Sequence, residues 1–440
     1  MRISQSFKHF LQLPTDQPID CEVRHNFRRN FINNALDGIF WMLGESFVSV
    51  STILPVFAST LTDSPVLIGL VPALINAGWF LPQLLMAGHV QRLAQKMPFA
   101  RAMAIVERLP YLVLPLTAYL LHWISVELAL IFFMLVIAWR GVASGMVALP
   151  WQEVIASVIP SPVRSRFFGV SRTIGRIMGV LGSIISGTVL ALLTYPNNYA
   201  LSFLIGAVFI WVSYFFFAKT IEPMTEIKES DNIPNRNRNL LNDFQEYKAT
   251  LQRDLNFVKY LISRTFFQMS SMAIAFLAVY GIQHYRLADE QAAIFTGIIF
   301  FSGTIGFLLY GWIGDRLGPR TVLLISDGMQ AISLLLTLFN LGVWSIYIIF
   351  LILGFAQSGY IIGELIIVME LGPDEKRPTY IGLARTLPGF IILIAPLIGG
   401  LLVGQLGYRM MFTTALVFSV GGTLLLFGVK DRSRVSNSKT

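Results

Sequence analysis

Charged side chains inside apolar stretches are the residues of this sequence that could do chemistry. Asp37, Trp41 and Glu45 lie in the apolar segment 31–58 and recur every four residues, so they share one face of a helix. Arg140 lies in a second apolar segment, which runs in the opposite direction across the predicted membrane. Counting inward at about 1.5 Å per helical residue brings Arg140 to the depth of Glu45, so we expect the two charges to pair.

Charges inside a membrane span are rare because each costs about 2.5–3.5 kcal/mol even on the most lenient insertion scale. They therefore predict a function by default. Burial and the guanidinium of Arg140 act on the proton affinity of Glu45 in opposite directions, so this affinity changes when the surroundings change. Such a carboxylate is sufficient for proton coupling, which we assign to Glu45, Asp37 and Arg140. The alternative is that Glu45 and Arg140 form a fixed structural tie.

Twelve apolar segments must position these residues. Of the 440 residues, 55% are hydrophobic and 13% are charged, with a mean hydropathy of +0.65, whereas a soluble domain has about 25% charged residues. A membrane-crossing helix takes about 20 mostly apolar residues, so we predict an all-α polytopic protein, integral to the cell membrane. The predicted transmembrane helices are 31–58, 66–88, 98–122, 126–149, 166–194, 199–220, 260–284, 291–313, 320–340, 344–370, 379–404 and 408–430.

The basic residues indicate how these spans are oriented. If the N-terminus is cytoplasmic, the outer loops hold only Arg286 and Arg409 of the 33 Lys and Arg residues. Because cytoplasmic loops are enriched in basic residues, both termini are predicted to be cytoplasmic. The basic residues are spread over every inner loop, which argues against a nucleic-acid-binding surface.

A long polar segment divides the predicted spans into six and six. Its apolar side chains from Leu240 to Val258 have helical spacing, which predicts an amphipathic helix on the inner membrane face. A shift of 213 residues gives identical residues at seven of 28 positions when 160–187 is aligned with 373–400. We therefore predict two pseudo-symmetric six-helix bundles. The predicted domains are a tail at 1–30, a bundle at 31–220, the linker at 221–259, a bundle at 260–430 and a tail at 431–440.

The loop between the eighth and ninth predicted spans reads GWIGDRLGPR, from Gly311 to Arg320. Together with twelve spans in two halves, this loop resembles the signature of the major facilitator superfamily. The resemblance implies an inner-gate latch, in which glycines allow a tight turn and charged side chains bridge neighbouring helices. The alternative is a simple basic turn. The implied latch residues are Gly311, Asp315, Arg316, Gly318 and Arg320, with Arg164 and Arg377 in two equivalent inner loops.

The resemblance also implies a central substrate cavity lined by the first, fourth, seventh and tenth spans. Its implied residues are Trp41 from the first span, Gln268 and Ser271 from the seventh, and Gln357, Tyr360 and Glu364 from the tenth. Three acids against one arginine favour a neutral or cationic solute, and Trp41 and Tyr360 could stack on a ring. The implied function is a proton-coupled secondary transporter that moves a small solute by alternating access, either as symport or as efflux antiport.

The polar segments do not predict an enzyme. They contain no nucleotide-binding loop, metal-ligand cluster or nucleophile–base arrangement, and the single cysteine, Cys21, lies in the N-terminal tail. We expect no metal and no cofactor besides a proton gradient, and a monomer whose partners are a small-molecule substrate and the lipid bilayer. The alternative is a scaffold, assembly or lipid- or pigment-delivery factor that keeps this fold without transporting. Paired charges at the membrane midplane favour transport.

Overall fold

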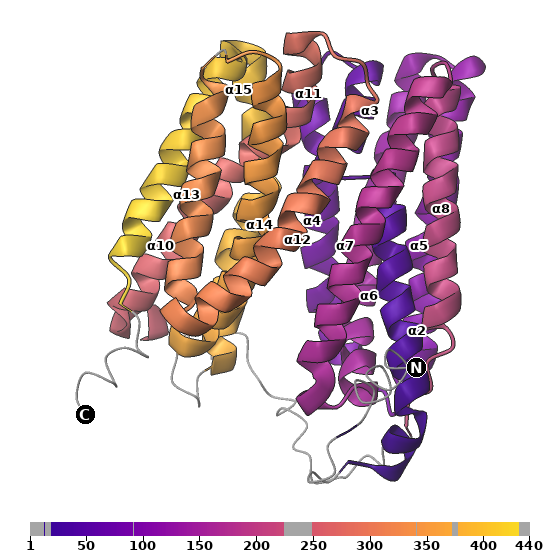
Figure 1. Ribbon diagram of the computed structural model, residues 1–440, viewed down its shortest axis with the longest axis vertical. Helices are drawn as coiled ribbons and strands as arrows, with labels where there is room; N and C mark the ends of the chain where they lie inside the picture. Colours follow the sequence, from indigo (N-terminus) through magenta and orange to yellow (C-terminus); the bar gives the residue numbers. More distant parts are fainter. Residues whose placement is uncertain are drawn as a thin grey trace, which may run out of the picture.

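The chain folds into long helices that run side by side along the long axis of the molecule (Figure 1). The computed structural model describes residues 13, 19–90, 92–223, 249–339, 341–371 and 377–430. Within these ranges all regular secondary structure is helical. Eight of the described helices are long and apolar enough to cross a membrane, judged by length and composition. The all-α class predicted from the sequence is therefore confirmed for the described residues.

The helices of the N-terminal half overlap the first six predicted spans. They are α2 (Cys21–Glu45), α3 (Ile53–Leu61), α4 (Pro65–Val90), α5 (Met97–Tyr119), α6 (Val126–Val158), α7 (Ser161–Leu192) and α8 (Asn197–Phe217). A short 3₁₀ turn at Leu120–His122 follows α5.

The first predicted span consists of two helices. α2 begins before the predicted start because Asp20 caps it, accepting a hydrogen bond from the backbone amide of Glu22 at 2.7 Å. It ends at Glu45, before the segment 46–52, in which four of the seven residues carry a hydroxyl group, and α3 starts only at Ile53. Serine and threonine hydroxyls compete for backbone hydrogen bonds, as Ser46 does by donating to the Leu43 carbonyl at 2.6 Å.

The helices of the C-terminal half overlap the last six predicted spans. They are α10 (Leu255–Ser270), α11 (Ile274–Tyr285), α12 (Gln291–Leu317), α13 (Pro319–Thr337), α14 (Trp344–Leu371) and α15 (Arg377–Phe427). A 3₁₀ turn at Ser271–Ala273 joins α10 to α11. α15 covers two predicted spans, and its break is at Gly407, whose φ of 81° is unfavourable for residues with a side chain. The predicted linker helix falls largely outside the described residues, of which 249–253 are helical.

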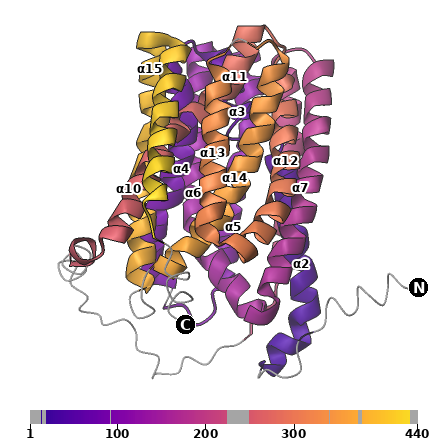
Figure 2. The same cartoon turned by 60° about the vertical axis from the view of Figure 1, so that its left-hand side comes forward.

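The two halves form two bundles, which meet through α4 against α15 and through α7 against α12. The beginning of α2 and the end of α15 lie at one end of the molecule, here called the terminal end (Figure 2). The opposite end, where α3 and α11 lie, is called the far end. Two hydrogen bonds join the halves towards the far end: Thr52 to Thr296 at 2.5 Å, and the Tyr199 hydroxyl to Asp289 at 3.1 Å. The described hydrogen bonds between the bundles thus hold the far end closed.

Candidate functional site

Glu45 and Arg140 pair as their positions predict. Nη2 of Arg140 lies 2.8 Å from each carboxylate oxygen of Glu45, and Nε of Arg140 donates to the Tyr111 hydroxyl at 3.0 Å. That hydroxyl in turn donates to Glu45 Oε1 at 2.5 Å, while Arg140 Nη1 donates to the Val48 carbonyl at 3.2 Å. One acid and one base therefore form a closed triangle with a tyrosine between them, and their formal charges cancel.

A second ionic cluster surrounds Asp37, towards the terminal end of α2. Arg108 lies 3.3 Å from Asp37 Oδ1 through Nη2 and 3.1 Å from Glu107 Oε2 through Nη1. Ser213 on α8 donates to Asp37 Oδ1 at 2.5 Å. The side chains of Asp37 and Glu107 are 7% and 6% exposed. Two buried carboxylates thus share one guanidinium, so the cluster carries one formal negative charge in excess when both acids are ionised.

Trp41 lies between the two clusters. Cζ of Arg108 stands 5.0 Å from the centre of the Trp41 ring, within the range of a cation–π interaction. The same ring meets Tyr111 edge to face, with the ring centres 5.8 Å apart. The face of Asp37, Trp41 and Glu45 that the sequence predicts is therefore a continuous row of interacting side chains.

The sequence analysis missed Glu107 and Arg108, although both lie inside the predicted span 98–122. The signal that singled out Arg140, a charge within an apolar segment, was equally present at these positions. The same holds in the C-terminal half for Arg264 on α10 and Asp327 on α13, which form an ion pair with fully buried side chains. That pair contains one acid and one base, so its charges balance.

The implied substrate residues of the C-terminal half come together between α10 and α14. The side-chain amide of Gln268 donates to the Tyr360 hydroxyl at 2.7 Å, and the Ser271 hydroxyl donates to the Gln268 carbonyl at 2.6 Å. Gln357 and Glu364 lie one turn to either side of Tyr360 along α14, and both are half-buried. None of the described contacts of Gln268 or Tyr360 reaches the N-terminal half.

The implied latch loop lies between α12 and α13. Gly318 ends α12 with a φ of 81°, and its amide donates to the Gly314 carbonyl at 3.0 Å. Arg316 stands over the Trp312 ring at 4.2 Å, and Arg320 donates to the Phe427 carbonyl at 2.5 Å, at the end of α15. Gly311 is half-buried within α12.

Asp315 is exposed and makes no hydrogen bond or ion pair among the described residues. Arg164, at the predicted inner loop that follows α6, donates to the carbonyls of Ala156 and Ile159 at the end of that helix. The side chain of Arg377 lies outside the described residues. Across the described residues, the latch charges are therefore not engaged with acidic partners in this conformation.

A cavity of about 330 Å³ adjoins the Asp37 cluster in the N-terminal bundle. Asp37, Glu107 and Arg108 line one part of it, and Arg172 of α7 lines another. Its volume lies at the lower end of the roughly 300–1,000 Å³ that is usual for small-molecule sites. The aromatic side chains in its wall are Trp41, Trp79, Trp151, Phe167, Phe168 and Phe217.

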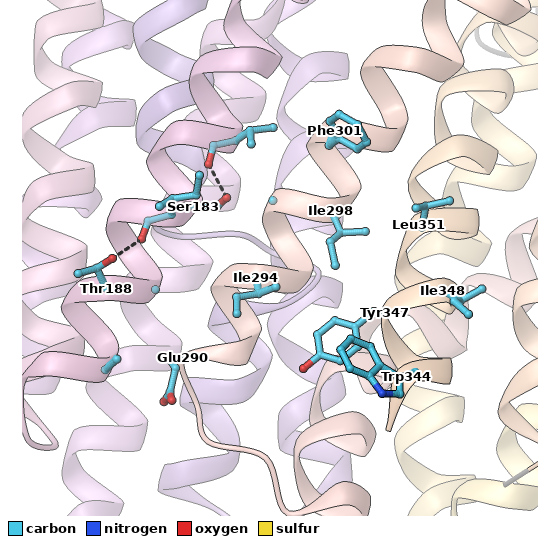
Figure 3. Close-up of a pocket in the computed structure, with 15 residues that line it drawn as sticks. Ser183, Thr188, Glu290, Ile294, Ile298, Phe301, Trp344, Tyr347, Ile348 and Leu351 are labelled. Atoms are coloured by element: carbon cyan, nitrogen blue, oxygen red, sulfur yellow. Dashed lines mark hydrogen bonds between the residues drawn. The ribbon is translucent and has the colours of Figure 1, made fainter. Parts of the chain in front are cut away.

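A larger groove of about 710 Å³ runs between α7, α12 and α14 (Figure 3). Its wall is mostly apolar, and Ile184, Phe301 and Ile348 in it are exposed on the outer surface of the helices. The hydroxyls of Ser183 and Thr188 donate back to carbonyls of their own helix. An apolar, outward-facing groove suits lipid hydrocarbon better than a polar solute. The cavity beside Asp37 is therefore the candidate site for a small polar solute.

Comparison with known proteins gives one family match and several more distant relatives. The sequence model described as Major Facilitator Superfamily matches residues 260–440. An uncharacterized MFS-type transporter of Methanocaldococcus jannaschii is 25% identical over 290 residues, which cover 64% of this chain and 68% of that protein. A gentisate transporter of Corynebacterium glutamicum is 30% identical over 158 residues, covering 33% of this chain and 36% of that protein.

Solved structures match over nearly the whole chain. A nucleoside transporter, NupG, superimposes with a TM-score of 0.65 at 15% identity, covering 91% of this chain and 98% of the other. A D-xylose-proton symporter also gives a TM-score of 0.65, at 14% identity, covering 92% and 97%. At such identities the likeness concerns the fold alone.

Proposed function

Because this chain is a member of the major facilitator superfamily, a family of secondary transporters and not of enzymes, we propose that it couples the movement of a small solute to protons. It is a multi-pass integral membrane protein whose class binds small molecules within the membrane. The solute is moved by alternating access, in which the two bundles rock against each other.

We further propose twelve spans with both termini in the cytoplasm. On this assignment α2 and α3 form the first span, α10 and α11 the seventh, and α15 the last two, separated at Gly407. The six-plus-six division at the linker 221–259 supports the two predicted bundles. The terminal end is then cytoplasmic, which agrees with the distribution of basic residues. The closed far end makes this conformation inward-facing, which also accounts for a latch acid, Asp315, without a described partner.

The observation that carries the proton proposal is the shared guanidinium of Arg108. Asp37 and Glu107 are both buried, and Arg108 can neutralise only one of them. An uncompensated charge inside a membrane protein is costly, and binding one proton removes it. We assign the transported proton to this carboxylate pair.

Glu45 is the second candidate for binding the proton, and Arg140 is the residue that sets the proton affinity of its carboxylate. The charge of Glu45 is already matched by Arg140, and its carboxylate accepts a further hydrogen bond from Tyr111. Its side chain is nevertheless 19% exposed, more than those of Asp37 and Glu107. Trp41 joins the two clusters, so a change of charge at one cluster alters the field at the other.

Proton movement in proteoliposomes tests this function. Vesicles containing the protein and a trapped pH-sensitive dye are challenged with a panel of sugars, nucleosides, amines and organic acids. At least one solute should change the internal pH with the native protein, and Glu107→Gln should abolish that signal. Glu127→Gln, at the exposed start of α6, is the matched control and should behave as native. Solute accumulation driven by a sodium gradient and indifferent to pH would overturn the proton assignment.

A further inference from the structure

Helix α7 carries two arginines within its apolar length, Arg172 and Arg176. They lie one helical turn apart, and Arg176 is at the middle of the helix. Neither forms an ion pair among the described residues. Charged side chains in membrane spans normally pair with each other or line a polar path, so each of these guanidinium groups needs a role.

Arg176 has a packing role between the halves. Its Cζ stands 4.6 Å from the ring centre of Phe307 and 5.9 Å from that of Phe300, both on α12. A Cβ atom placed on Gly303 would lie 2.0 Å from Arg176 Nη1, so the guanidinium rests against the backbone of α12. The charge of Arg176 is thus stabilised by aromatic faces and close packing at the contact of α7 with α12.

Arg172 has no such contact. Its side chain is exposed, and it lines the 330 Å³ cavity beside Asp37 and Glu107. The described ion pairs of both acids are with Arg108, and none among the described residues involves Arg172. The cavity therefore presents one guanidinium whose donors are free to bind a ligand.

The rest of the cavity wall is suited to a flat, apolar group. Trp41, Trp79, Trp151 and Phe168 contribute aromatic rings from four different helices, α2, α4, α6 and α7. Aromatic rings stack on planar ligands, while the fork of an arginine matches the two oxygens of a carboxylate.

We infer that this cavity binds a small planar organic anion, such as an aromatic carboxylate, and that Arg172 is the partner of its negative charge. The inference rests on the proposed transport function and names the class of its solute. The sequence alone favoured a neutral or cationic solute because its charge count covered other residues. It omitted Glu107, Arg108 and Arg172, which line this cavity, and it included Glu45, Arg140 and Glu364, which do not. Asp37 and Glu107 share Arg108, which leaves one negative charge in that cluster, and Arg172 carries a separate positive charge elsewhere in the wall, so the formal charges of the cavity sum to zero. Binding one anion together with one proton keeps that sum, which favours uptake of the anion with a proton.

Binding to the purified protein in detergent tests the inference, because it requires neither a gradient nor transport. Benzoate, 1-naphthoate and indole-3-acetate are each compared with the uncharged amide of the same ring, by thermal stabilisation and by quenching of tryptophan fluorescence. At least one carboxylate should bind about tenfold or more tightly than its amide, as expected of one charge-assisted hydrogen-bonded pair. Arg172→Gln should remove this preference and leave amide binding unchanged, and Arg172→Lys should keep part of it.

Arg92→Gln, at an exposed position of the loop between α4 and α5, is the matched control and should bind as native. The inference is overturned if no carboxylate binds more tightly than its amide, or if the preference survives Arg172→Gln. Either result would leave unaffected the test of proton coupling, in which Glu107→Gln abolishes the pH change in proteoliposomes. Conversely, loss of proton coupling with intact carboxylate binding would refute the transport mechanism and not the site.

Discussion

Asp37 on α2 and Glu107 on α5 bind opposite nitrogens of one guanidinium, that of Arg108. The neighbouring pair of Glu45 and Arg140 is instead matched one to one. This difference separates an ionic cluster with a surplus acid from one whose charges are balanced. The first cluster is therefore the one that we propose to bind the proton, and the second holds α2 against α6.

Breaking the balanced pair should destabilise the protein. Arg140→Ala leaves the carboxylate of Glu45 buried without its partner, and we expect the free energy of unfolding to fall by about 3–5 kcal/mol. Tyr111→Phe removes only a hydrogen-bonding hydroxyl and should cost about 1 kcal/mol. The measurement is thermal denaturation in detergent. The double variant with Glu45→Gln should recover part of the loss, and a double variant as unstable as Arg140→Ala would contradict the pairing argument.

The latch can be tested at Asp315. This residue has no described partner in the conformation seen here, so Asp315→Asn should not destabilise the inward-facing form. If the carboxylate bridges helices when the inner side closes, the substitution shifts the population towards the inward-facing form and lowers transport. Cross-linking yields between cysteines on the two bundles at the terminal end report the population. If Asp315→Asn changed neither transport nor cross-linking, the loop would be a simple basic turn and not a latch.

The orientation can be read with the native cysteine. Cys21 is exposed at the terminal end, so an impermeant thiol reagent should not label it in intact cells. In a Cys21→Ser background, Asp63→Cys and Asn197→Cys at the far end should be labelled, and Ser165→Cys at the start of α7 should not. The readout is labelling before and after permeabilisation. Labelling of Ser165→Cys in intact cells would reverse the proposed topology.

The folded state should gain stability in acid through Asp289 at the far end. Burial raises the pKa of Asp289 above its usual 3.8 and outweighs the hydrogen bond from Tyr199, which lowers it, with Glu290 adding to the rise. The folded state therefore binds this proton more tightly than the unfolded state does. The resulting gain in folding stability is complete at pH values below the ordinary pKa of 3.8, and it is lost as the pH rises through the folded-state pKa. Asp289→Asn should flatten this part of the profile of melting temperature against pH. A variant with the native slope would show that another group titrates.

The sequence predicted much of the architecture because membrane helices follow from local composition. The segment predicted at 66–88 is α4 at Pro65–Val90, and the depth argument for Glu45 and Arg140 needed only the helical rise. The break after Glu45 was not predicted, because a few serines and threonines do not lower the apolarity of a span.

The partner of Asp37 could not be derived in the same way. Arg108 reaches it from α5, and which faces of α2 and α5 meet depends on packing of the whole bundle. The charge of Arg108 was nevertheless visible inside its predicted span. Arg108 was not predicted as a site residue because the family resemblance implies a cavity lined by the first, fourth, seventh and tenth spans, and this residue lies in the third.

Infrared difference spectroscopy between acid and alkaline pH measures the central claim most directly, because it detects protonated carboxyl groups without a substrate. On the purified protein in lipid, we predict a band from one buried carboxylic acid that disappears in Glu107→Gln and persists in Glu45→Gln. Size-exclusion chromatography confirms that both variants are folded. Loss of the band in Glu45→Gln, with the native spectrum retained in Glu107→Gln, would contradict the account and move the proton to the Arg140 pair.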